Sequence, residues 1–162
     1  MKIVSDASPL INLSRIGELG LLRKLYEELI IPEAVWNEVV VDGAGQAGAA
    51  EVNAAKWIKT KKVCNKNLVQ ALQQNLDAGE SEAIALSLEI NTVLLLMDER
   101  IGREVARHFG LHCTGLIGIL IEAKHKRHII SIKPYLDSLR QIAGFRINND
   151  LYLRVLLDEN EA

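Results

Sequence analysis

Residues 76–100 read LDAGESEAIALSLEINTVLLLMDER, and two kinds of pattern meet in this stretch. From Asp77 to Glu89, apolar residues recur at the three- and four-residue spacing of an amphipathic helix. Val93–Met97 is a run of five apolar residues that ends at Asp98, which is typical of a strand buried on both faces. A helix that leads into a buried strand predicts an α/β protein with a parallel sheet.

The same alternation continues on both sides of this stretch. Lys2–Ser5 is a short apolar strand that ends at Asp6, and Ser8 with Pro9 then predicts the N-cap and first turn of a helix. Other strands are expected over residues 30–31, 57–63 and 111–113. Other helices are expected over residues 21–29, 32–41, 68–76, 101–109, 115–124, 134–143 and 150–157, with a loop over residues 42–50. We therefore expect a central, mostly parallel sheet flanked by helices.

Length and composition exclude several classes of protein. A chain of 162 residues predicts one domain over residues 1–162. Nineteen Lys and Arg residues against 21 Asp and Glu residues exclude a polycation, so nucleic acid would have to bind a local basic patch. Cys64 and Cys113 are far apart, which argues against a disulfide scaffold and favours a reducing cytoplasm. No apolar run approaches the roughly 20 residues of a membrane span, so no membrane contact is expected.

Four carboxylates have positions that suggest chemistry. Asp6 and Asp98 each follow a predicted strand, so both should lie at the carboxyl edge of one sheet. Glu38 lies on the apolar side of its predicted helix, and Glu80 begins the apolar face of the next. Each also has an ordinary explanation, such as a helix cap or a solvated surface. Together they would repel one another, and a hard cation such as Mg²⁺ or Mn²⁺ would relieve that repulsion.

The segments that carry these acids, taken together, resemble a PIN domain. They read IVSDASPLINL at residues 3–13, IPEAVWNEV at residues 31–39 and LDAGESEAIALSLEINTVLLLMDERIGREVA at residues 76–106. Glu80 precedes Asp98 by eighteen positions, as in the usual family pattern, whereas Glu82 precedes it by sixteen and is the reserve candidate. The motif GFRI at residues 144–147 is similar to a pattern in one PIN-like subgroup of prokaryotic proteins. The third acid is Glu where many PIN domains have Asp.

The resemblance implies a three-layer PIN-like fold, with a nuclease core of about residues 1–115 and a C-terminal helical extension of about residues 116–162. It implies a Mg²⁺- or Mn²⁺-dependent endoribonuclease in the cytoplasm. Asp6, Glu38, Glu80 and Asp98 would be both catalytic residues and metal ligands, and Glu82 or Glu99 could join them. Because the family includes VapC-type toxins of toxin–antitoxin pairs, an antitoxin protein is a candidate partner besides RNA.

Two other functions stay open at this stage. One is a catalytically inactive module that kept the fold and binds RNA or protein. The other is a phosphatase on a related fold, although Asp6-Ala7-Ser8 lacks a second Asp two positions after the first. Two basic segments, Lys56–Lys66 and Lys124–His128, could contact RNA phosphates or be ordinary solvated surface. Apolar residues after Gly115 are more numerous than a small core requires, which predicts a homodimer.

Overall fold

The computed structural model describes residues 1–162. Five strands form one sheet in the order β3-β2-β1-β4-β5, and every neighbouring pair is parallel. The strands are β1 (Ile3–Ser5), β2 (Leu29–Pro32), β3 (Ile58–Lys61), β4 (Leu94–Leu96) and β5 (Cys113–Thr114). The predicted α/β architecture with a parallel sheet is therefore confirmed.

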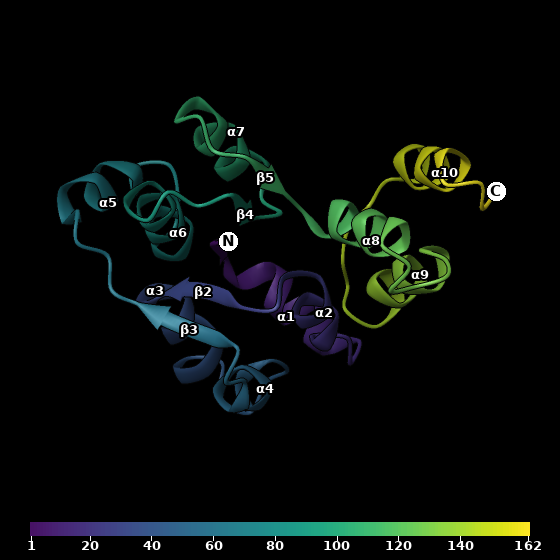
Figure 1. The fold of residues 1–162 in the computed structure, drawn as a ribbon, viewed down its shortest axis with the longest axis horizontal. Helices are drawn as coiled ribbons and strands as arrows, with labels where there is room; N and C mark the ends of the chain where they lie inside the picture. The colour runs from purple at the N-terminus through teal and green to yellow at the C-terminus, as the bar shows by residue number, and fades with distance from the viewer.

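Helices surround this sheet (Figure 1). They are α1 (Ala7–Arg15), α2 (Gly20–Tyr26), α3 (Glu33–Trp36), α4 (Ala49–Ala54), α5 (Lys66–Leu72), α6 (Ala78–Glu89), α7 (Arg100–His108), α8 (Leu116–His125), α9 (Lys133–Gln141) and α10 (Asn149–Asp158). One π-helical turn, η1 (Asn37–Val41), follows α3 directly.

Alternate residues of the strands face two separate apolar clusters, which makes three layers. Val4 and Leu95 belong to a cluster with the apolar side chains of α5, α6 and α7. Ile3, Leu29 and Leu96 belong to the larger cluster, which also contains side chains of α1, α2 and the C-terminal helices. Both faces of the sheet are covered, as a parallel sheet requires.

The structure corrects several predicted boundaries. The helix predicted over residues 21–29 is α2, which ends at Tyr26, and β2 begins at Leu29. The helix predicted over residues 32–41 consists of α3 and η1, and the amide of Asp42 bonds the carbonyl of Asn37 at 2.7 Å. The loop predicted over residues 42–50 leads into α4, a helix that the glycine-containing sequence did not indicate.

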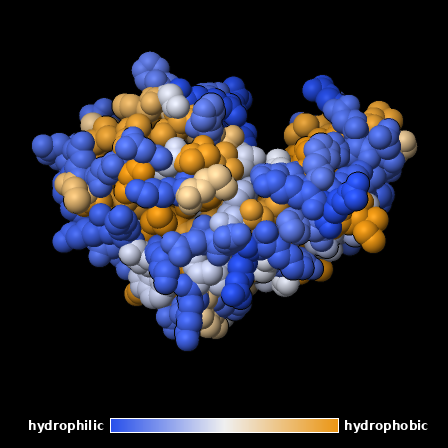
Figure 2. Space-filling model, in the orientation of Figure 1, coloured by the Kyte–Doolittle hydropathy of each residue, from blue (hydrophilic) through white to orange (hydrophobic).

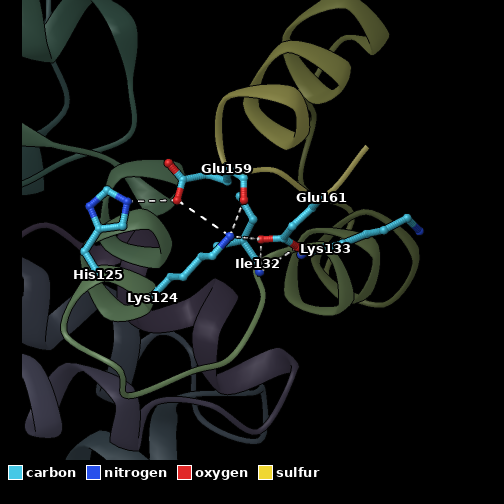
Figure 3. Close-up of polar contacts among 6 residues, drawn as sticks. All are labelled: Lys124, His125, Ile132, Lys133, Glu159 and Glu161. Atoms are coloured by element: carbon cyan, nitrogen blue, oxygen red, sulfur yellow. Dashed lines mark hydrogen bonds and ion pairs between the residues drawn. The ribbon is translucent and has the colours of Figure 1, made fainter.

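The C-terminal helices α8, α9 and α10 lie together on one side of the molecule (Figure 1). Polar contacts that are partly exposed join the end of the chain to α8 and α9 (Figure 3). The Glu161 carboxylate accepts hydrogen bonds from the Ile132 amide at 2.9 Å, the Lys133 amide at 2.9 Å and Lys124 Nζ at 2.8 Å. We call Lys124, Ile132, Lys133 and Glu161 the C-terminal latch. No helix of the protein combines the length and the apolar character needed to cross a bilayer.

Candidate active site

Asp6 lies at the carboxyl edge of the central strand. Its amide donates to the carbonyl of Leu96 in β4 at 2.9 Å, which continues the pairing of β1 beyond Ser5. Asp6, and not the predicted Ser8, is the residue before the first turn of α1, yet its side chain makes no capping hydrogen bond. The carboxylate is therefore left free for another role, although Asp6 is only 6% exposed.

Burial has a measurable consequence for this carboxyl group. It raises the pKa of Asp6 to about 7, with smaller increases from the charges of Asp77, Glu38 and Asp98, against a decrease from the Ala7 amide. A buried carboxylate costs free energy unless it is protonated or paired with a positive charge. Asp6 is thus poised either to hold a proton or to bind a cation near neutral pH.

Glu38 reaches the same place from the π-helical turn η1. A Cβ atom built on Gly79 of α6 would lie 3.2 Å from Glu38 Oε1 and 3.3 Å from Asp6 Oδ1. The two carboxylates therefore converge on the space that a side chain at Gly79 would fill. Burial, followed by the charges of Asp77 and Asp42, raises the pKa of Glu38 above its usual value. Glycine at position 79 keeps this gap open.

Glu80 is bound to the start of its own helix. Its amide donates to Asp77 Oδ1 at 2.8 Å, and the Asp77 amide donates back to Glu80 Oε1 at 3.3 Å. These reciprocal bonds form a capping box, which satisfies free amides at a helix N-terminus. Glu80 is 7% exposed, and its other oxygen lies 3.1 Å from where a Cβ on Gly102 would be. Burial and then the contacts with Asp77 raise the pKa of Glu80 to about 8.

Asp98 lies two residues beyond β4 and contacts the start of α8. Its Oδ1 accepts the Leu116 amide at 2.8 Å, and its Oδ2 accepts the Ser8 hydroxyl at 3.4 Å. Burial raises the pKa of Asp98, while the Leu116 amide, Arg103 and Ser8 lower it. Ser8 was expected to cap α1; it lies within the first turn instead, from where its hydroxyl reaches Asp98.

Asp77 is the acid that sequence reasoning passed over. Burial is the largest cause of the raised pKa values of Asp6, Glu38 and Glu80, and the charge of Asp77 adds to the increase at each of them. The sequence pattern begins a helix at Asp77 and assigns its side chain no role. The spacing D-x-x-E over residues 77–80 is the signature of a capping box and would have indicated its place at the start of α6.

The two reserve acids have structural contacts elsewhere. Glu82 accepts the Ala34 amide at 3.0 Å, at the start of α3. Glu99 is the N-cap of α7 and accepts the Gly102 amide at 2.7 Å. Both side chains thus satisfy free amides at helix N-termini.

The donor atoms around Gly79 are suited to a hard cation. Asp6 and Glu38 face each other there, whereas Glu80 points toward Gly102 and Asp98 toward Gly115. No three His, Cys, Asp or Glu side chains are close enough together to hold one metal ion. Mg²⁺ is usually bound through one or two carboxylates and keeps several waters. The carboxylate pair therefore fits Mg²⁺ or Mn²⁺ as two direct ligands.

The two basic segments differ in their surroundings. In the second, Lys124 bonds Glu161, His125 lies 2.9 Å from Glu159, and Lys126 pairs with Glu122 at 2.8 Å. These side chains are therefore paired with carboxylates of the C-terminal helices and the chain end that follows them. In the first, the lysines on and beside β3 are exposed, with no carboxylate partner. Trp36 and Trp57 pack against the larger apolar cluster.

Comparison with known proteins agrees with this architecture. A family model described as a PIN domain matches residues 2–161. No curated protein matches the chain.

Proposed function

The chain belongs to the PIN-domain family, and from that premise we propose that it is a metal-dependent ribonuclease that hydrolyses phosphodiester bonds of RNA. PIN domains are generally nucleases, which supports a hydrolase. The observation that carries the proposal is the convergence of Asp6 and Glu38 on the gap above Gly79. Asp6, predicted to follow the first strand, and Glu38, predicted on the apolar side of its helix, lie close together beyond the carboxyl end of β1. Ligands of parallel α/β folds bind at this edge of the sheet.

In this mechanism Asp6 and Glu38 would hold Mg²⁺ or Mn²⁺. The bound cation would act as a Lewis acid that activates water and neutralises charge on the phosphate. Asp98, oriented by the Ser8 hydroxyl and the Leu116 amide, would position water at the edge of the site. Burial and the contacts with Asp77 raise the pKa of Glu80, which favours its protonated form and would lower the negative charge that approaching RNA meets.

The experiment is cleavage of mixed RNAs by the full chain, with and without Mn²⁺. The unsubstituted protein should cleave only with the cation, and Asp6→Asn should reduce the rate at least about a hundredfold, because it removes a charged ligand. Asp158→Asn is the matched control, since Asp158 is exposed and distant in sequence from the acids. Cation-independent cleavage, or full activity in Asp6→Asn, would refute this mechanism.

The alternative is a catalytically inactive PIN-like module that binds RNA or protein. Asp98 and Glu80 both bond amides at the start of helices. Because these contacts stabilise the fold, both carboxylates would be present in a protein without catalytic activity, which favours the alternative. The same assay separates the two: the inactive module would bind RNA and leave it intact with every divalent cation tried.

We also propose a cytoplasmic location, a homodimer and, if the protein is a toxin, an antitoxin partner. Cys64 and Cys113 form no disulfide, which suits a reducing compartment. Leu153 and Leu157 of α10 remain exposed, and Figure 2 shows apolar atoms on the outer surface of the C-terminal helices. A gene for a small DNA-binding protein beside this one would support the toxin.

A further inference from the structure

A cavity of about 210 Å³ opens beside Asp98, between α7 and the C-terminal helices. Arg103 of α7 lines one part of it, and Phe145 and Arg146 of the segment between α9 and α10 line another. Figure 2 shows that the surface is hollowed between the part that carries α7 and the part that carries α10. The mechanism proposed above uses Asp98 but neither arginine.

Arg103 forms no ion pair, and the carboxylate whose charge it offsets is Asp98, whose pKa it lowers. Its Nε is buried and has no hydrogen bond, and no carboxylate forms an ion pair with its guanidinium. A Cβ on Gly115 would lie 2.8 Å from Arg103 Nη1 and 2.6 Å from Asp98 Oδ1, so glycine allows both side chains to lie against the backbone there. A buried donor without an acceptor is costly. Arg103 lines the cavity, so a ligand oxygen there would bind the accessible part of its guanidinium group.

Arg146 comes from the opposite side and is also unpaired. It is exposed and forms no hydrogen bond or ion pair. Its segment is nevertheless held in place, because the Phe145 amide donates to the Leu139 carbonyl at 2.9 Å. Arg140 of α9 donates to Asn149 Oδ1 at 2.7 Å, which joins α9 to the start of α10 across this segment. Arg146 is therefore carried by an ordered backbone at the rim of the cavity.

We propose that Arg103 and Arg146 hold one phosphate of the RNA strand beside the scissile bond, with an adjacent base against Phe145. This subsite rests on the proposed ribonuclease function and extends it. The acids at the sheet edge repel RNA, so a strand that approaches Asp98 needs cations on the other side of its path. Guanidinium groups bind phosphate oxygens in a bidentate manner, and aromatic rings stack on unpaired bases. The C-terminal extension would thus supply half of the substrate site.

The test is equilibrium binding of a fluorescent single-stranded RNA oligonucleotide to the full chain, with a chelator present so that the strand stays intact. Arg146→Ala should weaken binding about tenfold. The slope of the binding constant against salt concentration, both on logarithmic scales, should become shallower by the amount expected for one lost phosphate contact. Arg103→Lys keeps the charge but loses the planar fork, so it should weaken binding less than Arg146→Ala does. Arg23→Ala, which removes an exposed arginine of α2 outside the cavity, should bind as the unsubstituted protein does.

The outcomes separate the subsite from the catalytic proposal. Unchanged binding by Arg146→Ala, equal loss in Arg23→Ala, or no RNA binding by the unsubstituted protein would each overturn the subsite. Loss of binding in Arg146→Ala without any cation-dependent cleavage by the unsubstituted protein would refute the nuclease and keep the subsite. Where cleavage occurs, Arg146→Ala should raise KM more than it lowers kcat, and an unchanged KM would exclude the subsite.

Discussion

At the scale of single residues, Gly79 has the clearest consequence for chemistry. Gly79→Ala would place a methyl group 3.2 Å from Glu38 Oε1 and 3.3 Å from Asp6 Oδ1, so the carboxylates would have to move apart. We expect weaker Mn²⁺ binding and slower cleavage. The fold should be kept or stabilised by about 0.5–1 kcal/mol, because alanine is the better residue within a helix. Calorimetric titration with Mn²⁺ and thermal unfolding measure both effects.

The control for this substitution is Gly20→Ala, at the first residue of α2. A Cβ there would meet no atom within 4 Å. This variant should bind Mn²⁺ as the unsubstituted protein does. If Gly79→Ala binds the cation with undiminished affinity, the site is not formed by Asp6 and Glu38.

The raised pKa of Asp6 predicts how stability depends on pH. Burial moves this pKa from 3.8 to about 7, so the folded state binds the proton more tightly than the unfolded state does. Stability of the metal-free protein should therefore fall as pH rises from about 4 to about 7, by a few kcal/mol at most. Thermal unfolding with a chelator at several pH values measures the fall, and Asp6→Asn should flatten it. A stability that rises through this window would contradict the assignment.

Sequence reasoning located Asp6 and Asp98 because position in a parallel sheet follows from the strand pattern alone. Both lie at the same edge of the sheet in the structure. It missed Asp77, because the capping-box spacing of Asp77 and Glu80 was overlooked and does not by itself indicate that Asp77 lies near Asp6 and Glu38. It misplaced the cap at Ser8, since the N-cap of α1 is Asp6 and the helix begins two residues earlier than predicted.

At the scale of elements, the sequence pattern failed to predict the short and irregular helices. The periodicity of residues 32–41 predicted one helix, whereas tertiary packing turns its second half into η1. That turn carries Glu38, so the position of the second acid could not follow from an ideal helical spacing. Helix α4 follows glycines that normally indicate a loop, and buried Ala49 and Val52 hold it against the core. Long helices with regular spacing, such as α6, were predicted within a residue.

The C-terminal latch predicts a local effect at the level of α9 and α10. Burial raises the pKa of Glu161, but hydrogen bonds from Ile132, Lys124 and Lys133 outweigh it and hold that pKa below its usual value. Glu161→Ala should leave the two amides without their acceptor and remove one of the acceptors of Lys124 Nζ, which still donates to the Glu159 carbonyl, at a cost of about 1–3 kcal/mol. Amide hydrogen exchange should quicken in α9 and α10 and change little in the sheet.

Glu28→Ala is the matched control for the latch. Glu28 is exposed, and its side chain makes no hydrogen bond. The control should unfold at the same temperature as the unsubstituted protein. Uniformly faster exchange across the whole chain in Glu161→Ala would mean that the latch supports global stability and not these two helices.

At the scale of the whole molecule, the homodimer stays a prediction, and exposed apolar residues of α10 indicate where its interface would lie. Most apolar residues after Gly115 are part of the core, including Leu116, Ile119 and Leu156. Leu153 and Leu157 of α10 remain 51% and 60% exposed. Light scattering at micromolar concentration should give twice the single-chain mass of 18.0 kDa, and Leu157→Asp should return it to one chain. A single-chain mass for the unsubstituted protein would end the proposal.

The order of strands in the sheet has a consequence for synthesis on the ribosome. β1, the first strand to be made, has β4 as a partner, with Ile3 opposite Leu94, so most of the chain must be translated before the centre of the sheet can close. Such distant pairing is slow to form. Asp6 and Glu38 are consequently made before Gly79 and the rest of α6, which border the gap between the two carboxylates. The proposed nuclease would therefore stay inactive until β4 has left the ribosome and the centre of the sheet has closed.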